Sequence, residues 1–422
     1  MTVLYQLAGE DASAEYNRVH APSLIQSEDS SSVLKIGELE TAPAASRKNE
    51  KQDISASSPL SQKYGLGNII NLYDFETIAR ASLSPKSWAF VNSGMVHFLE
   101  VPSIRGEAKG PFTNPHSLGA NDNITRDANI QYLQRIWFRP AIMRNVGAWN
   151  TRTNLFGCEL DFPVYIAPAG AAKAVCDEGE LALARGAAAT GTIHCIATTA
   201  SYPLQDILDA TPKQAFFQLY VNKDRSKTEQ LVRQATQSGK VRAIFVTADL
   251  PVMSKREADE RVKSHDSNVD TIAINKGNTA GGRKSEGLAK SNSSFIDPCL
   301  NWKDIQWLRG LTSLPILVKG VQRAQDARIA MEMGLDGIVI GNHGGRAADT
   351  STPAILILLE VHRYCPEAFQ RMTVLVDGGF RRGSDVIKAL CLGAKAVGFG
   401  RPFMYALNYG QEGLEHAVNS MS

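Results

Sequence analysis

The sequence predicts an α/β fold of the TIM (β/α)8 barrel type. Between residues 164 and 400 it contains eight short apolar runs of strand length, separated by stretches with helical character. Uninterrupted runs of this kind are typical of parallel strands that are covered on both faces. Eight strand and helix units in roughly 250 residues also match the usual size of this barrel. The predicted strands are 164–168, 194–198, 216–220, 243–249, 315–320, 337–342, 373–378 and 396–400.

Helix-like segments fill the intervals between the predicted strands. Clear examples are 226–238, 324–334 and 383–392, and the last two end near a glycine, as helix C-termini commonly do. The alternative fold is a doubly wound open sheet. That sheet would need a topological switch point and usually has fewer strands, so the barrel is the preferred prediction.

Composition excludes two classes of partner. The chain has 422 residues, of which 43% are hydrophobic and 21% charged, and a formal net charge of +2. This balance lacks the basic surface of a nucleic-acid-binding protein, and no run approaches the roughly 18 apolar residues of a membrane span. The six cysteines contain no CxxC pair, which favours reduced thiols and an intracellular protein. No targeting segment is visible, and no set of metal ligands is expected.

Two segments depart from the repeating pattern. Residues 27–64 are rich in Ser, Ala, Lys, Glu and Pro and nearly free of aromatic residues, which predicts a disordered linker. Residues 254–296 are dominated by Lys, Asp, Ser, Asn and Gly, which predicts a mobile loop inserted into the main domain.

Polar residues stand at the ends of most predicted strands. In a barrel of this type the active site is built where the strands end, so these side chains are expected to meet at one mouth. A single polar residue at such a position is usually a helix cap or a turn former, but their convergence favours a site. The candidates are Gln218, Tyr220, Thr247, Asp249, Lys319, Asn342, His343, Asp377 and Arg401.

The segment Gly-Asn-His-Gly-Gly-Arg at 341–346 carries the most specific chemistry. His343 is a natural general base near neutral pH, and the Arg346 guanidinium matches a carboxylate with two parallel hydrogen bonds. Asp249 ends a buried strand, where its carboxylate needs a partner, and His343 is the obvious one. Lys319 likewise lies in an apolar strand and is expected to face a negative group, such as an anionic reduced cofactor. The alternative is a turn histidine beside a surface arginine.

Two later segments predict a phosphate site. Asp-Gly-Gly-Phe-Arg-Arg-Gly at 377–383 and Gly-Phe-Gly-Arg-Pro at 398–402 follow the seventh and eighth predicted strands. TIM barrels often hold phosphate with these two loops and a helix N-terminus. A phosphosugar or nucleotide barrel would use the same loops, but the adjoining His343 and Arg346 disfavour that alternative.

Four of these segments, 319–321 (Lys-Gly-Val), 342–346 (Asn-His-Gly-Gly-Arg), 376–379 (Val-Asp-Gly-Gly) and 400–403 (Gly-Arg-Pro-Phe), resemble the FMN-dependent α-hydroxy acid dehydrogenase/oxidase family. The similarity runs from about residue 68 to about residue 413, and segments 72–75 and 218–222 point to the flavocytochrome branch. The resemblance implies FMN as the cofactor and oxidation of a small L-2-hydroxy acid, with L-lactate as the first candidate, to the 2-oxo acid. It also implies oxygen or a cytochrome as electron acceptor, a homo-oligomer, specifically a tetramer, and a mitochondrial location.

The same resemblance implies a role for each site residue. His343 would be the base and Asp249 its partner, Arg346 and Arg256 would hold the substrate carboxylate, and Tyr220 would contact the substrate. The residues implied to hold the flavin are Gln218 and Thr247 at the ring, Lys319 at its N1/O2 edge, and Asp377, Gly379, Arg381, Gly400 and Arg401 at the ribityl phosphate, with Gly378 beside them.

A second, partial resemblance concerns the N-terminus. Residues 8–12 and 19–22 look like the tail of a b-type haem domain, with His20 as one axial ligand. The His-Pro-Gly-Gly segment that would carry the other ligand is absent from the sequence. Residues 1–26 are therefore expected to be a truncated remnant without haem, and residues 65–422 the FMN barrel.

Three departures from the family bear on activity. Phe90 stands where the family usually has a substrate-binding tyrosine, so weaker substrate binding is expected. The Ser-Gly-Ala-Asn-Asp motif is split between Ser93-Gly94 and Ala120-Asn121-Asp122 by an insert at about 95–118, and the chain ends at Ser422 where relatives continue. Ala197 and Gly341 also stand where relatives often have serine. The alternative function is therefore a catalytically impaired, FMN-binding remnant of the family.

Overall fold

The structure is a computed structural model that describes residues 64–92, 122–252, 254 and 294–421. All of them belong to the larger of two compact units of the chain, Ser58–Ser422. The predicted haem-domain remnant (1–26), the linker up to residue 63, the insert (95–118) and most of the loop at 254–296 lie outside the described residues. Those four predictions therefore stay predictions.

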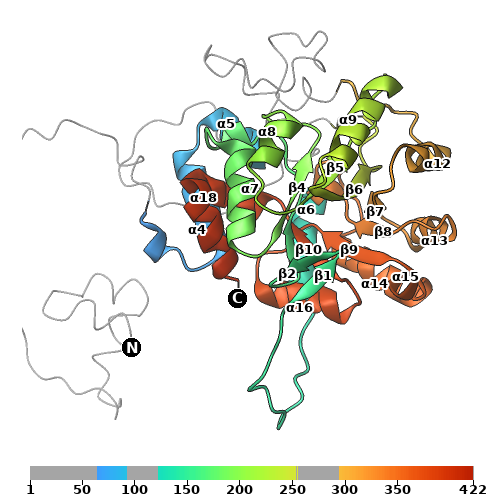
Figure 1. The fold of residues 1–422 in the computed structure, drawn as a ribbon. Helices are drawn as coiled ribbons and strands as arrows, with labels where there is room; N and C mark the ends of the chain where they lie inside the picture. The colour runs from blue at the N-terminus through green and yellow to red at the C-terminus, as the bar shows by residue number, and fades with distance from the viewer. Residues whose placement is uncertain (1–63, 93–121, 253, 255–293, 422) are drawn as a thin grey trace, which may run out of the picture. The chain divides into compact units, whose positions relative to one another are not determined.

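Eight parallel strands form a closed barrel, which confirms the predicted fold class and excludes the open sheet. The strands follow one another around the barrel in chain order, and β10 closes the ring by pairing with both β9 and β3 (Figure 1). All eight predicted runs are strands of this barrel. They are β3 (Val164–Ile166), β4 (Ile193–Ala197), β5 (Ala215–Leu219), β6 (Val241–Thr247), β7 (Ile316–Val321), β8 (Gly337–Ile340), β9 (Thr373–Asp377) and β10 (Ala396–Phe399).

Helices follow the strands along the chain. The three predicted examples are present, as α9, α13 and α16. The helices after the strands are α7 (Gly179–Ala189), α8 (Leu204–Asp209), α9 (Arg225–Gln237), α12 (Trp302–Leu311), α13 (Ala324–Glu332), α14 (Ala354–Tyr364), α15 (Ala368–Arg371), α16 (Gly383–Cys391), α17 (Arg401–Ala406) and α18 (Gly410–Asn419). None of the helices within the described ranges is long and apolar enough to cross a bilayer.

Within the described residues, three α-helices precede the barrel: α4 (Leu72–Ser82), α5 (Pro85–Asn92) and α6 (Ile124–Gln134). Asn71 and Asp74 form a capping box that starts α4, because each side chain satisfies a backbone N–H of the first turn. The ring of Phe75 meets Tyr409 edge to face at 6.1 Å, which docks α4 beside α17 and α18. Helices α4 and α5 therefore pack against the last helices of the chain, whereas α6 packs against the turn after β8 and against α14.

The hydrophobic core has two layers. Because side chains alternate along a strand, one set points into the barrel and the other packs under the helices. The inner set includes Phe216 and Phe245, whose rings stack at 5.1 Å, and the buried Tyr165. Side chains thus fill the barrel axis, as expected for a packed eight-stranded barrel.

A short hairpin, which the sequence analysis did not predict, covers one end of this inner core. Strands β1 (Thr153–Leu155) and β2 (Cys158–Leu160) pair antiparallel through a two-residue turn at Phe156 and Gly157, both with positive φ. Two such residues are typical of a type I′ turn. The buried side chains of Leu155, Cys158 and Leu160 belong to the same apolar cluster as the barrel interior.

Candidate active site

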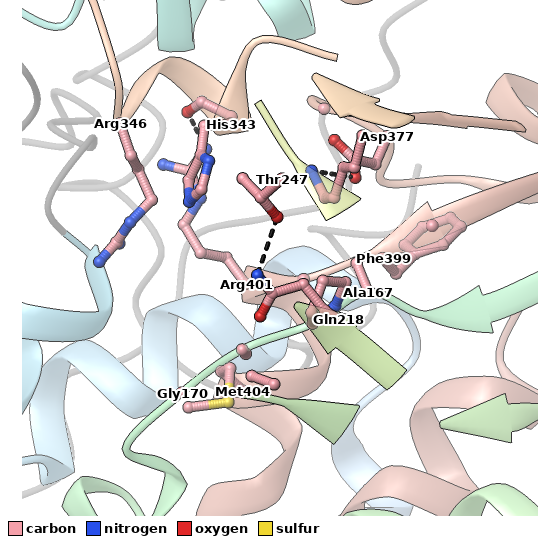
Figure 2. Close-up of a pocket in the computed structure, with 18 of the residues that line it drawn as sticks. Ala167, Gly170, Gln218, Thr247, His343, Arg346, Asp377, Phe399, Arg401 and Met404 are labelled. Carbon is pink, nitrogen blue, oxygen red and sulfur yellow. Dashed lines mark hydrogen bonds and ion pairs between the residues drawn. The ribbon is translucent and has the colours of Figure 1, made fainter. Parts of the chain in front are cut away.

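A pocket lies where the barrel strands end, and all eight strands or the residues directly after them contribute to its wall. It encloses about 1250 Å³ of empty space, part of it open to solvent. Figure 2 shows the side chains that point into it. In strand order the lining includes Ala167, Ala197, Gln218, Thr247, Lys319, His343, Asp377 and Phe399.

His343 lies three residues beyond the end of β8, in a tight turn, η4 (His343–Gly345). Its backbone is left-handed, with φ of 57°, and Gly344 and Gly345 continue with φ of 62° and 75°. Only glycine adopts this conformation without strain, so the two glycines allow the turn. A Cβ at Gly345 would also come within 2.7 Å of the backbone nitrogen of Arg126. The turn is therefore seated directly on the first turn of α6.

A buried pair of asparagines holds this turn. The Nδ2 of Asn129 donates to Oδ1 of Asn342 at 2.9 Å, and Nδ2 of Asn342 donates back to Oδ1 of Asn129 at 3.0 Å. The same Oδ1 of Asn342 accepts the backbone N–H of Gly345. Both side chains are buried. A fully satisfied buried network of this kind fixes one conformation, here that of the residues beside His343.

The imidazole of His343 bridges two polar side chains. Its Nδ1 lies 2.8 Å from Oδ1 of Asp249, and its Nε2 lies 3.2 Å from the hydroxyl of Tyr220. Burial alone would raise the pKa of Asp249, but His343 and Lys319 outweigh burial and hold that pKa below its ordinary value. An ionised Asp249 favours a proton on Nδ1, which leaves Nε2 as the atom that can accept a proton.

Arg346 faces the same pocket as His343 (Figure 2). Its guanidinium donates to the carbonyl oxygens of Val91 and Phe90, at 3.0 and 3.1 Å, and lies over the Phe90 ring at 5.7 Å. These contacts tie Arg346 to the end of α5. Phe90 and Val91 line the pocket, which places Phe90 where its ring can meet a ligand of Arg346.

Lys319 has a carboxylate partner within the protein. Its Nζ lies 2.9 Å from Oδ2 of Asp377, and both side chains are buried. Burial alone would lower the pKa of Lys319, but the Asp377 and Asp249 carboxylates reverse this and raise it above its ordinary value. Lys319 is therefore a fixed positive charge on the pocket wall. Asp377, expected at the phosphate, has its carboxylate turned to this lysine.

Gln218 and Thr247 form the polar part of the wall between β5 and β6. The Nε2 of Gln218 donates to Oγ1 of Thr247 at 2.8 Å, and its Oε1 accepts the backbone N–H of Thr198. Both residues are buried and line the pocket. Their orientation is thus set before any ligand binds.

Basic residues and glycines gather on the side of the pocket between β9 and β10. Arg381 is buried, and its Nε has no hydrogen-bond partner in the described part of the chain. Arg401 donates to the carbonyl oxygen of Gly344 at 2.6 Å, and a Cβ at Gly400 would meet nothing within 4 Å. A buried arginine N–H without an acceptor, next to open space and a second arginine, fits an anion such as phosphate.

The residues present fit FMN as a whole. The basic side can hold the phosphate, the buried Gln218, Thr247 and Lys319 offer polar atoms for a ring edge, and His343 and Arg346 lie on the remaining side. A pocket of this size also accommodates a ligand of that class. Figure 2 shows Gln218, Thr247, His343, Arg346 and Arg401 around one cavity, with Gly170 and Met404 at the side opposite His343.

The structure brings together the predicted site residues that it describes, and Gly378 and Gly379 line the same pocket. Arg256 lies outside the described residues, so its predicted role stays untested. Two features were not predicted from the sequence: the clamp of Asn129 on the His343 turn, and the hydrogen bonds from Arg346 to the carbonyl oxygens of Phe90 and Val91. Asn342, directly before the histidine, was the available signal for the clamp, but its partner lies 213 positions away.

Comparison with known proteins agrees with this site. The family model described as FMN-dependent dehydrogenase matches residues 110–422. L-lactate dehydrogenase (cytochrome) of Wickerhamomyces anomalus is 37% identical over 426 residues, which cover 99% of this chain and 68% of that protein. Glycolate oxidase 3 of Oryza sativa subsp. indica is 41% identical over 301 residues, covering 69% of this chain and 79% of that one.

Two solved structures show the same fold. The flavin-binding domain of baker's yeast flavocytochrome b2 has a TM-score of 0.70 and 37% identity, covering 84% of this chain and 81% of that chain. Mandelate oxidase with (S)-4-hydroxymandelic acid has a TM-score of 0.72 and 32% identity, covering 84% and 92%.

A closed (β/α)8 barrel with an imidazole, a guanidinium and a basic glycine-rich loop at one mouth fits a flavin-dependent oxidoreductase. The chain belongs to the FMN-dependent dehydrogenase family, as its family match and relatives show. Its relatives place it among the FMN-dependent 2-hydroxy acid dehydrogenases and oxidases of this family. The relatives act on lactate, glycolate and mandelate according to their names, so the family alone does not select one substrate.

Proposed function

We propose that the protein oxidises a small L-2-hydroxy acid, with L-lactate as the first candidate, to the corresponding 2-oxo acid. The observation that supports this most directly is the joint placement of His343 and Arg346 in one pocket with a fixed positive charge on Lys319. A 2-hydroxy acid needs a cation for its carboxylate and a base near its hydroxyl and α-carbon, and these two residues supply both.

The residues of this chain would divide the work as follows. Arg346, with Arg256, binds the substrate carboxylate and so orients the α-carbon toward Nε2 of His343. Nε2 accepts a proton from the substrate, and the Asp249 carboxylate stabilises the imidazolium that results. The hydroxyl of Tyr220, next to Nε2, is positioned to contact the substrate hydroxyl. Bound FMN would supply the acceptor for the two electrons and for the second proton that leave the substrate.

The flavin would be held by the residues on the other walls. Gln218 and Thr247 would contact the ring, Lys319 its N1/O2 edge, and Arg381 and Arg401 with Gly378, Gly379 and Gly400 the phosphate. Asp377 would act through Lys319, because its carboxylate already pairs with that ammonium group. A fixed cation beside the ring stabilises negative charge that develops there.

The acceptor, assembly and location are parts of the same proposal. Oxygen or a cytochrome would take the electrons from the reduced protein, a tetramer would be the assembly, and a mitochondrial or peroxisomal compartment the location. A relative named peroxisomal (S)-2-hydroxyacid oxidase supports oxygen as the acceptor and a peroxisomal location, and the relatives named L-lactate dehydrogenase (cytochrome) support a cytochrome as the acceptor. Hydrogen peroxide production and cytochrome c reduction, measured side by side, distinguish the two acceptors.

A catalytically impaired FMN-binding protein is the second candidate, and the absence of a hydroxyl on Phe90 favours it. The two candidates differ in one measurement. Addition of L-lactate under anaerobic conditions bleaches the flavin absorption of an active enzyme, whereas an inactive one stays yellow. A colourless preparation that binds no added FMN would contradict both. Glycolate, L-mandelate and D-lactate, tested in the same way, identify the substrate class and its handedness.

His343→Gln is the decisive variant for the proposed mechanism. Glutamine fills similar space but accepts no proton at neutral pH, so we expect bound flavin without reduction by substrate. Flavin content is the control, because a loss of colour would show that the pocket itself had been disturbed. Retained bleaching in this variant would eliminate His343 as the base.

A further inference from the structure

Arg126 is a buried arginine near the catalytic turn that the proposed mechanism does not use. Only 2% of its surface is exposed, and its Nε and Nη1 have no hydrogen-bond partner among the described residues. Its Nη2 lies 2.7 Å from Asp127, whose side chain is 39% exposed. Buried donors without acceptors are costly, so their presence calls for an explanation.

The backbone of α6 fixes where Arg126 lies. The carboxylate of Asp349 accepts the backbone N–H groups of Asp122, Ile124 and Thr125, and so holds the start of this helix to the segment after the catalytic turn. Arg126 follows at once, with its backbone directly under Gly345. The guanidinium of Arg401 lies under the neighbouring Gly344, to whose carbonyl it donates. Two arginines thus stand below adjacent glycines.

The charges in this region do not balance. Arg126, Arg381 and Arg401 bring three positive charges, against which stand the buried Glu76 carboxylate, 3.5 Å from Arg381, and the partly exposed Asp127 carboxylate, 2.7 Å from Arg126. Burial, and then the proximity of Arg401, lower the pKa of Arg126 to about 9. The nearby carboxylates of Asp127 and Glu76 act on this pKa in the opposite direction, but they do not fully compensate the charge of Arg126. A phosphate group carries close to two negative charges at neutral pH and would do so.

We propose that Arg126 is a third arginine of the cofactor site, and that its positive charge acts with those of Arg381 and Arg401 to hold the phosphate of FMN. The inference rests on the proposed placement of that phosphate at Arg381 and Arg401. It assigns a ligand-binding purpose to a charge that destabilises the unliganded fold, since strain of this kind persists where a ligand relieves it. Riboflavin lacks this phosphate. The three arginines would therefore determine the preference of the protein for FMN over riboflavin.

The test is a titration of the apoprotein with FMN and with riboflavin, followed by quenching of flavin fluorescence. Arg126→Met keeps an unbranched apolar stem and removes the charge. We expect FMN affinity to fall about tenfold or more, riboflavin affinity to stay unchanged, and the melting temperature of the apoprotein to stay the same or rise. Arg135→Met, at the exposed end of the same helix, is the matched control for loss of one positive charge.

Arg381→Met separates the inference from its premise. If Arg381→Met weakens FMN but not riboflavin while Arg126→Met changes neither, the phosphate is placed correctly and the role of Arg126 is wrong. If neither variant alters the preference for FMN, the phosphate placement itself fails, and the inference with it. Equal weakening of both flavins by Arg126→Met, together with a lower melting temperature, would show a purely structural role and overturn the proposal.

Discussion

The buried carboxylate of Asp249 pairs with the partly exposed imidazole of His343, with Oδ1 and Nδ1 2.8 Å apart. The second oxygen of this carboxylate has no hydrogen-bond partner among the described residues. Gly320 explains why the carboxylate fits, because a Cβ there would lie 2.3 Å from its Cγ. The full charge of Asp249 is thus directed at the histidine and, at longer range, at Lys319.

Asp249→Asn should therefore impair the chemical step rather than ligand binding. The amide keeps the shape but removes the charge that stabilises the imidazolium, so we expect the rate of flavin reduction to fall about 10²- to 10⁴-fold. Stopped-flow absorbance under anaerobic conditions measures this rate. FMN affinity, measured on the same protein, should be unchanged. A rate within twofold of the unaltered protein would show that Asp249 does not support the base.

Phe90→Tyr should improve substrate binding. The ring of Phe90 lies under the guanidinium of Arg346, and a hydroxyl added to it would reach toward the bound carboxylate. A hydrogen bond to a charged group is worth about 1.5 to 3 kcal/mol, so KM should fall about tenfold or more while kcat changes little. Phe90→Leu is the control, because it alters the ring without adding a hydroxyl. An unchanged KM in Phe90→Tyr would argue that this ring does not face the substrate.

Tyr405→Phe should weaken the orientation of Arg346 from a distance. The buried hydroxyl of Tyr405 donates to Oδ1 of Asn92 at 2.8 Å, and Asn92 ends the helix whose Phe90 and Val91 carbonyl oxygens hold the arginine. Loss of this donor leaves Asn92 short of one buried hydrogen bond, which costs about 1 to 3 kcal/mol and loosens the end of α5. We expect a several-fold higher KM, with kcat and FMN affinity nearly unchanged.

Tyr409→Phe provides the matched control for this prediction. Tyr409 lies one helical turn after Tyr405. Its hydroxyl donates to the carbonyl oxygen of Tyr64 at 2.7 Å and not to α5. Its removal should leave KM unaltered. Equal effects of the two substitutions on KM would show that Tyr405 acts through general stability and not through α5.

His194 should make the fold sensitive to mild acid. It lies in β4, fully buried, and neither ring nitrogen has a hydrogen-bond partner among the described residues. Burial lowers its pKa from 6.5 to about 3. Because the unfolded chain takes up this proton below about pH 6.5 and the folded chain does not, stability is full above that pH and falls as the pH decreases toward 3.

The size of this effect can be checked by substitution. The buried His194 should lower the free energy of unfolding at pH 5 by about 2 kcal/mol relative to pH 7. His194→Leu removes the titrating group, so its melting temperature should fall less between pH 7 and pH 5 than that of the unaltered protein. Identical shifts in both proteins would show that His194 does not contribute to acid sensitivity.

The sequence predicts the barrel well because each strand is a continuous apolar run, and burial on both faces leaves that pattern in every strand. It does not reveal β1 and β2, since strands of three residues are too short to show alternation. For the site, the end of a strand predicts which side chains share the mouth. Polar contacts across the fold, such as those of Asn129 with Asn342 and of Lys319 with Asp377, depend on packing that no local pattern encodes.

The hairpin at Thr153–Leu160 limits the routes by which substrate and product can reach and leave the active site. Side chains fill the barrel axis, and this hairpin covers one end of it. In the described part of the chain, the flavin site is therefore open only at the opposite end of the barrel. Reactant and product must then use the same rim, and the oxo acid has to depart before the next hydroxy acid can enter. For that reason, we expect the accumulating oxo acid to inhibit the enzyme competitively with respect to the hydroxy acid.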